Sequence, residues 1–309
     1  MNLEFKITKH LKKLAQKSEA IRKQFYPSKE ENKLEGKSFD PLKEESRSPV
    51  KGLIHRYPNR VLVLLTLNCA AYCRFCFRRR VVSDIQKGSL NERDLNRMVS
   101  YLKKHPQIKE VIISGGDPLT QPKLLELFLR KIVNLKQIKI IRIGTRLPVS
   151  DPQRINDNLL RVLRLIKKQP LYILLHFEHP DEITKETRGA IKKLRSLNAI
   201  LLSQSVFLKG INDDVKILDK LFTELLSLGI KPYYIFHNDE PKGTKHFTVD
   251  FKKEIQIMTK LRERLSGLAC PLYVYDDPNS QCKIPVPLDF DYSFIHSPQF
   301  LDKDLKDIK

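Results

Sequence analysis

The sequence predicts an α/β fold built around a mostly parallel sheet. From residue 60 onward, short apolar runs rich in β-branched residues alternate with amphipathic helical stretches, and this unit occurs six times. The strand runs are almost continuously apolar, which is typical of a sheet buried on both faces. An open doubly wound sheet and a partial barrel both satisfy this pattern.

The elements follow one another in a regular order. Strands are expected at residues 61–66, 110–114, 139–143, 171–175, 200–203 and 232–236. Helices are expected at residues 92–104, 122–134, 152–168, 184–197, 213–228 and 250–266. Each strand-then-helix unit implies a right-handed crossover to the next parallel strand. A seventh strand is expected at residues 272–275.

Three segments differ in composition and sequence pattern. Residues 1–50 are polar and interrupted by prolines, and we expect an N-terminal helical and irregular extension, with a helix at residues 3–25 and a connector at 29–48. Residues 51–266 form the α/β body. Residues 267–309 form a C-terminal segment whose tail, residues 302–309, is expected to be frayed.

Composition indicates a globular enzyme. The 309 residues are 41% hydrophobic and carry a net charge of +21. No apolar run is long enough to span a bilayer, and the N-terminus lacks the apolar stretch of a secretory signal, so we expect a cytoplasmic protein without a membrane partner. The positive charge is spread along the chain, which makes nucleic acid an unlikely partner despite the basic balance.

Three of the five cysteines fall within eight residues. Cys69, Cys73 and Cys76 have the spacing C-x3-C-x2-C directly after the first expected strand. Three thiolates on one loop can hold three irons of a [4Fe–4S] cluster and leave the fourth iron open. A structural zinc site normally needs four ligands, and the other two cysteines, Cys270 and Cys282, are distant in sequence.

This cysteine loop resembles that of the radical S-adenosylmethionine (radical SAM) superfamily. Phe75 before the last cysteine is usual there, and residues 114–118, Ser-Gly-Gly-Asp-Pro, resemble its glycine-rich element. The resemblance implies a partial barrel of six βα units, a [4Fe–4S] cluster and S-adenosyl-L-methionine (SAM) on the open iron. It also implies that Gly115, Gly116 and Asp117 meet the amino group of SAM.

The flanking sequences resemble one subfamily, the lysine 2,3-aminomutases, over about residues 50–290. The matching runs are residues 55–62, 142–149, 152–155, 176–182, 204–213 and 232–234, followed by Asp239, Gly243, His246, Phe247, Asp276 and residues 283–285. The resemblance implies an isomerase that uses pyridoxal 5′-phosphate (PLP) beside SAM and converts L-lysine to β-lysine. A 5′-deoxyadenosyl radical removes hydrogen from the β-carbon, and the α-amino group migrates.

Each role is carried over by position. Lys283 would bind PLP covalently as the catalytic lysine, and Arg56, Tyr57 and Arg60 would hold the PLP phosphate and ring region. His176 and Gln204 would lie near SAM or the PLP–substrate adduct.

The substrate would be held at both ends. Arg78 would bind its carboxylate, while Asp239 and Asp276 would receive the ε-ammonium group of lysine. An electron donor such as flavodoxin or ferredoxin is implied, and a homo-oligomer fits the resemblance as well as a monomer does.

The sequence departs from this subfamily in two places. Residues 279–282 replace the glycine run before the PLP lysine, which makes that loop stiffer. Asp214 stands where larger members have a zinc-binding cysteine, and the cysteine-bearing C-terminal extension is missing, so we expect no zinc.

Other functions stay open at this stage. The short length and residues 73–79 resemble the branch that makes β-lysine to modify translation elongation factor P. A radical SAM enzyme that modifies RNA would need the cluster without PLP. A degenerate, non-catalytic binding protein is a third reading.

Overall fold

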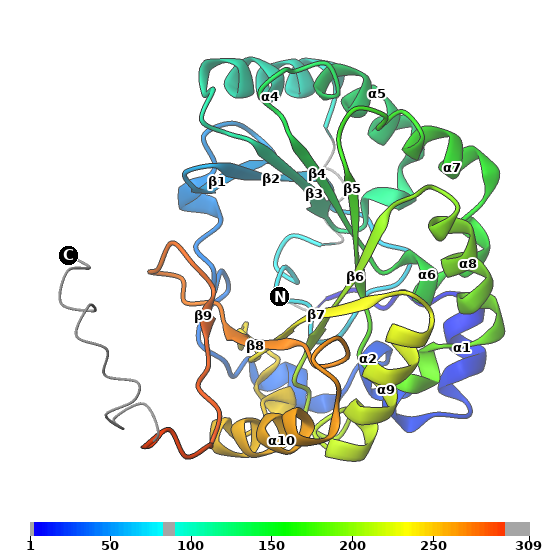
Figure 1. Ribbon diagram of the computed structural model, residues 1–309, viewed down its shortest axis with the longest axis vertical. Coiled ribbons are helices and arrows are strands. Elements are labelled where there is room, and N and C mark those ends of the chain that lie inside the picture. The colour runs from blue at the N-terminus through cyan, green and yellow to red at the C-terminus, as the bar shows by residue number, and fades with distance from the viewer. Residues whose placement is uncertain (1–2, 83–89, 294–309) are drawn as a thin grey trace.

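The strands form one curved sheet with helices on its outer side (Figure 1). The computed structural model describes residues 3–82 and 90–293, and the expected frayed tail at 302–309 lies outside these ranges. Among the described residues, the sheet order is β1 to β9, the same as the order along the chain. A doubly wound sheet reverses its strand order at a switch point, so the unbroken order identifies a partial barrel.

Strands β2 to β8 run parallel, and antiparallel strands β1 and β9 border them. The strands are β1 Leu53–Tyr57, β2 Arg60–Thr66, β3 Glu110–Gly115, β4 Ile140–Thr145, β5 Leu171–His176, β6 Ile200–Val206, β7 Lys231–Phe236, β8 Leu272–Tyr275 and β9 Ile284–Pro285. The helices are α1 Lys9–Ala15, α2 Glu19–Phe25, α4 Glu92–Lys104, α5 Pro122–Ile132, α6 Leu147–Ser150, α7 Asp157–Leu163, α8 Lys185–Arg195, α9 Val215–Ser227 and α10 Phe251–Arg264.

Two expected helices are interrupted, in each case by a capping side chain. The helix expected at residues 3–25 is split into α1 and α2, because the Ser18 side chain accepts a hydrogen bond from the backbone of Ile21 and starts a new helix. The helix expected at residues 152–168 is a short 3-10 turn followed by α7, which Asn156 caps in the same way. Strands β1 and β9 were not expected.

Burial alternates along β2, β3, β4 and β6. In β2, Val61, Val63 and Leu65 face outward and are at most 1% exposed, whereas Leu62 and Leu64 face inward and are partly exposed. The inner face is therefore not sealed, which differs from the expectation of a sheet buried on both faces. Polar side chains can occupy this partly accessible lumen.

The N-terminal segment packs into the same core as the barrel. Leu11, Ile21 and Phe25 are fully buried among barrel side chains. Farther along, Ser38 pairs with Pro241 in an isolated parallel bridge, and the backbone N–H of Lys37 donates to the carbonyl of Glu240. No helix within the described ranges is long and apolar enough to cross a membrane.

Candidate active site

The predicted cysteine loop begins directly after β2 and rests on the glycine turn that ends β3. The N–H of Gly116 donates to the carbonyl of Thr66 at 2.6 Å. A Cβ atom on Gly115 would lie 2.2 Å from that same carbonyl oxygen, and one on Gly116 would lie 2.5 Å from the carbonyl oxygen of Asn68. Gly115 also has φ +119°. Only glycine allows this approach, so the two predicted glycines fix the start of the cysteine loop.

The three cysteines are partly buried and interact electrostatically with one another. Burial raises the pKa of Cys69 well above its ordinary range, and Asp117 and the other two cysteines raise it further. Burial and the neighbouring Cys73 raise the pKa of Cys76 to about 11. A bound metal displaces the thiol proton even where the pKa is raised, so three cysteines on one loop are a donor set that fits an iron–sulfur cluster.

These cysteines do not form a site for a single ion. Within the described residues, no three His, Cys, Asp or Glu side chains converge on one metal position. In a four-iron cluster each thiolate binds a different iron, so the donors surround a shared space without meeting at a point.

Asp117, the other predicted member of the glycine element, ties β3 to β4. Its carboxylate accepts hydrogen bonds from the Thr145 hydroxyl at 2.9 Å and the Arg146 backbone at 2.8 Å. Burial raises the pKa of Asp117, and these donors oppose the rise. The contact of residues 115–117 with SAM stays a prediction.

His176 and Gln204 lie side by side at the ends of β5 and β6, where the strand register pairs them. The Nε2 atom of His176 lies 2.5 Å from the carboxylate of Glu178, and the ring of Phe75 meets the histidine edge-on at 6.0 Å. Phe75 belongs to the cysteine loop, so both predicted residues face the space beside it.

The predicted PLP lysine lies between β8 and β9, at the edge of the sheet. The β8–β9 register pairs Tyr275 with Ile284, which places Lys283 opposite Asp276. The Nζ atom of Lys283 forms an ion pair with one oxygen of Asp276, and Arg56 Nη1 contacts the other oxygen at 2.7 Å. The structure therefore brings together three predicted residues from three strand ends, and Arg56 links β1 to the end of β8.

Arg56 and its neighbours form a cationic and aromatic group. Arg56 also donates to the carbonyl of Ser280 at 3.0 Å. Arg60 stacks on the Tyr57 ring at 3.8 Å, and Asn59 is the only side chain to which it donates a hydrogen bond in the described ranges. The Tyr57 hydroxyl is buried without a hydrogen-bond partner among the described residues. Arg60 and Tyr57 thus retain donors for a phosphate, whereas Arg56 already binds protein groups.

Asp239 faces Asp276 across a small pocket. Burial, with Asp276 as the next cause, raises the pKa of Asp239 to about 7. The pocket measures about 220 Å³ and is also lined by Tyr275, Pro278 and residues from the N-terminal segment, Lys37, Ser38, Asp40, Pro41 and Lys43. The repulsion from Asp276 that helps raise this pKa favours a positively charged ligand beside Asp239.

Arg78 is buried and already binds a carboxylate. Its Nε and Nη2 atoms contact Glu44 at 2.9 and 2.7 Å, and Nη1 lies 3.3 Å from the carbonyl of Gly115. Its role in binding the substrate carboxylate stays a prediction. Glu44 lies in the segment expected to be an irregular connector, and nothing in the sequence indicates this contact.

Comparison with known proteins identifies the family. The radical SAM superfamily model matches residues 63–221. The L-lysine 2,3-aminomutase of Clostridium subterminale is 38% identical over 286 residues, which cover 92% of this chain and 68% of that protein. The chain belongs to the radical SAM lysine 2,3-aminomutase family.

Two further comparisons define how far the likeness extends. The glutamate 2,3-aminomutase of Clostridioides difficile is also 38% identical, over 82% of this chain and 59% of that protein. The crystal structure of a radical SAM methyltransferase from Sphaerobacter thermophilus matches with a TM-score of 0.52 and 14% identity, over 72% of this chain and 68% of that chain, which supports the fold alone. The chain spans 57 to 66% of the length of several curated relatives.

No role was predicted from the sequence for a group of buried polar residues behind the cysteine loop. Arg146 follows β4, and Glu178 and Glu182 follow β5, where α/β folds place functional groups. They contact one another or buried residues of α2, a helix that the sequence did not connect with the site. Their position after strands, within the matching runs 142–149 and 176–182, was the available signal.

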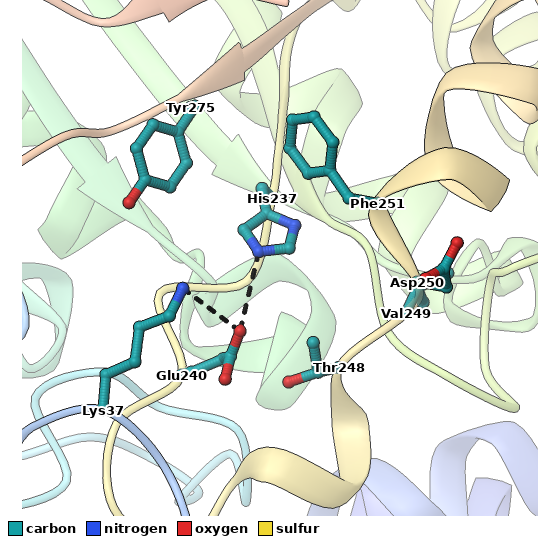
Figure 2. Close-up of a pocket in the computed structure, with 8 residues that line it drawn as sticks. All are labelled: Lys37, His237, Glu240, Thr248, Val249, Asp250, Phe251 and Tyr275. Carbon is teal, nitrogen blue, oxygen red and sulfur yellow. Dashed lines mark ion pairs between the residues drawn. The ribbon is translucent and has the colours of Figure 1, made fainter.

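A second pocket of about 480 Å³ lies beside α10 (Figure 2). The side chains of Lys37 and His237 point toward Glu240, at 3.2 and 3.7 Å, and Phe251 and Tyr275 lie on either side of the histidine. Lys37 and Tyr275 line both pockets, but none of the residues predicted for cofactors or substrate lines this one.

Proposed function

We propose that this protein is an L-lysine 2,3-aminomutase that depends on radical SAM chemistry and PLP. The observation that carries the proposal is the contact of Asp276 with Lys283 and Arg56, beside Asp239. This contact joins the lysine proposed to bind PLP and a cationic partner to one of the carboxylates that line the pocket. The cysteine loop supplies the other half of the required chemistry.

The proposed reaction exchanges two groups within one molecule. The amino group of L-lysine moves from C2 to C3, one hydrogen moves from C3 to C2, and no net oxidation occurs. When bound, the cluster with SAM supplies a radical that abstracts hydrogen, and PLP carries the amino group. Cys69, Cys73 and Cys76 would hold the cluster, and Lys283 and Arg60 would hold PLP.

The side chain of Lys283 indicates how lysine would be recognised. Its terminal ammonium is the same chemical group as that of the substrate, and Asp276 binds it directly. With Lys283 holding PLP, this carboxylate would be available to the ammonium of a substrate lysine. Asp239 would complete the site, and the pair would repel the side-chain carboxylate of glutamate.

The test is an anaerobic reconstitution of the full chain with iron, sulfide, PLP, SAM, dithionite and L-lysine. We expect β-lysine that requires both PLP and SAM, and no β-glutamate when L-glutamate replaces lysine. SAM cleavage without β-lysine would contradict the lysine assignment. Absence of PLP binding together with SAM cleavage would favour the RNA-modifying alternative, because Lys283, Arg56 and Arg60 have no role there.

The proposal includes partners and a place of action. The reaction needs a low-potential one-electron donor such as flavodoxin or ferredoxin, and a cytoplasmic location fits both. The same chemistry dedicated to elongation factor P is tested by mass spectrometry of that factor from a strain lacking this protein. Loss of the β-lysyl modification would support that use, and an unchanged factor would assign the product to free β-lysine.

A further inference from the structure

A buried arginine contacts one of the three cluster cysteines. Arg146 follows β4 and is 8% exposed, and its Nη1 atom lies 2.8 Å from the sulfur of Cys73. The guanidinium group is flanked by the rings of Phe25 and Phe75, whose centres lie 4.8 and 5.3 Å away. The reaction proposed above assigns no role to this side chain.

The arginine is held by buried acceptors on its other side. Its Nη2 atom contacts Glu182 at 3.0 Å and the side-chain oxygen of Gln24. Glu182 is fully buried and also accepts hydrogen bonds from the Gln24 amide at 2.9 Å and the Glu178 backbone at 3.0 Å. The guanidinium group therefore has a fixed orientation, with one nitrogen aimed at the sulfur.

We propose that Arg146 tunes the reduction potential of the cluster through its hydrogen bond to Cys73, and that Glu182 counterbalances its charge. Arg146 acts on the cysteine and not on a substrate, so it is a positioning residue. In the step concerned, a low-potential donor adds one electron to the cluster. No bond to the protein forms or breaks, and Arg146 keeps its protons.

The direction of the effect follows from charge. Reduction adds a negative charge beside Cys73, so a guanidinium that donates to its sulfur stabilises the reduced state and raises the potential. Glu182 carries the opposite charge behind the arginine and lowers the potential. Removing one or the other charge must therefore shift the potential in opposite directions, which a purely structural role does not require.

The experiment measures the midpoint potential of the reconstituted cluster. The full chain is titrated with dithionite and redox mediators, and the reduced cluster is followed by electron paramagnetic resonance without lysine or PLP. We expect Arg146→Gln to lower the equilibrium constant for reduction about tenfold, a shift of about 59 mV toward lower potential. Glu182→Gln should shift it toward higher potential.

A matched control separates this contact from a general loss of charge. Arg154 donates to the carbonyl of Thr120, and Arg154→Gln removes one positive charge near the same loop, so it should shift the potential less than Arg146→Gln does. Equal shifts in these two variants, or shifts of the same sign in Arg146→Gln and Glu182→Gln, would overturn the proposal. If Arg146→Gln fails to bind iron, Glu182→Gln alone decides: a shift to higher potential supports the proposal, and a shift to lower potential overturns it.

The cluster in this proposal rests on the family and on the cysteine loop, and not on lysine or PLP. A failed β-lysine assay with opposite potential shifts would contradict the proposed function and leave Arg146 in its role. Normal β-lysine formation without such shifts would support the proposed function and contradict the role of Arg146.

Discussion

The cysteine loop and the Lys283 segment are built in contrasting ways. The cysteine loop follows β2, which is paired with a strand on each side, and rests on the glycine turn of β3, and all three cysteines are partly buried. Lys283 precedes the two-residue strand β9 at the edge of the sheet. The loop before it is held mainly by cations from distant segments: Arg47 to Pro278 at 2.5 Å, Lys43 to Asn279 at 2.7 Å and Arg56 to Ser280 at 3.0 Å.

The cysteine loop is therefore the fixed end of the site, and the Lys283 segment is its adjustable end. Close backbone contacts leave the cysteine loop one conformation, whereas ionic and polar anchors at the edge can exchange partners when a ligand binds. If Lys283 holds PLP as proposed, its amino group would have to leave Asp276, and an adjustable anchor would suit that change. A cluster needs donors that do not move, so the rigid backbone contacts of the cysteine loop suit cluster binding.

Cys73→Ala should abolish cluster binding at the fixed end. Three thiolates are needed to hold the cluster, so we expect loss of bound iron after reconstitution and loss of all SAM cleavage. Iron content and visible absorbance measure the first, and chromatography measures the second. Cys270→Ala is the matched control, since Cys270 is buried outside this loop and should not change iron content. Retention of a full cluster in Cys73→Ala would contradict the cluster assignment.

Phe25→Ala tests whether the N-terminal helices support the fixed end. Phe25 is fully buried against Arg146, so we expect a loss of about 3–5 kcal/mol in the free energy of unfolding of the apoprotein. Urea denaturation measures this loss. Phe39→Ala removes a side chain that is 48% exposed and should change stability little. Similar small effects for both would mean that the extension does not share the core.

The pH dependence of lysine binding sharpens the account of the adjustable end. The pKa of Asp239 is raised to about 7, so this carboxyl group is protonated below pH 7 and ionised above it. Only the ionised form attracts an ammonium group. We expect kcat/KM for lysine to rise about tenfold per pH unit between about pH 5.5 and 7 and then to level. Asp239→Asn should bind lysine more weakly and lose this step, and a profile unchanged in that variant would exclude Asp239.

Arg47→Ala should have the smallest effect. One hydrogen bond from Arg47 to the Pro278 carbonyl anchors the loop before Lys283, so we expect the apparent affinity for PLP to fall about 2- to 10-fold. Titration of the PLP absorbance band measures it. Arg22→Ala, which removes an exposed ion pair with Glu19, should leave that affinity unchanged. Equal affinities in both variants would show that the anchor does not position Lys283.

The same contrast explains what the sequence could predict. The expected strands are present because each is an apolar run between helical patterns, and the cysteine spacing is local. The contact of Arg56 with Asp276 joins residues 220 positions apart, and β9 is too short to leave a pattern. Glu44 and Gln24 lie in segments without recognisable motifs, and their contacts with Arg78 and Arg146 form only when the N-terminal segment packs on the barrel.

The most direct test of the central claim, that the two ends carry separate halves of one reaction, is Lys283→Ala. We predict that this variant binds a full cluster and cleaves SAM under dithionite, but loses PLP absorbance and forms no β-lysine. Lys242→Ala, at a loop lysine that no proposed role uses, should match the wild-type chain in all four measurements. β-Lysine formation by Lys283→Ala at the wild-type rate would contradict the account.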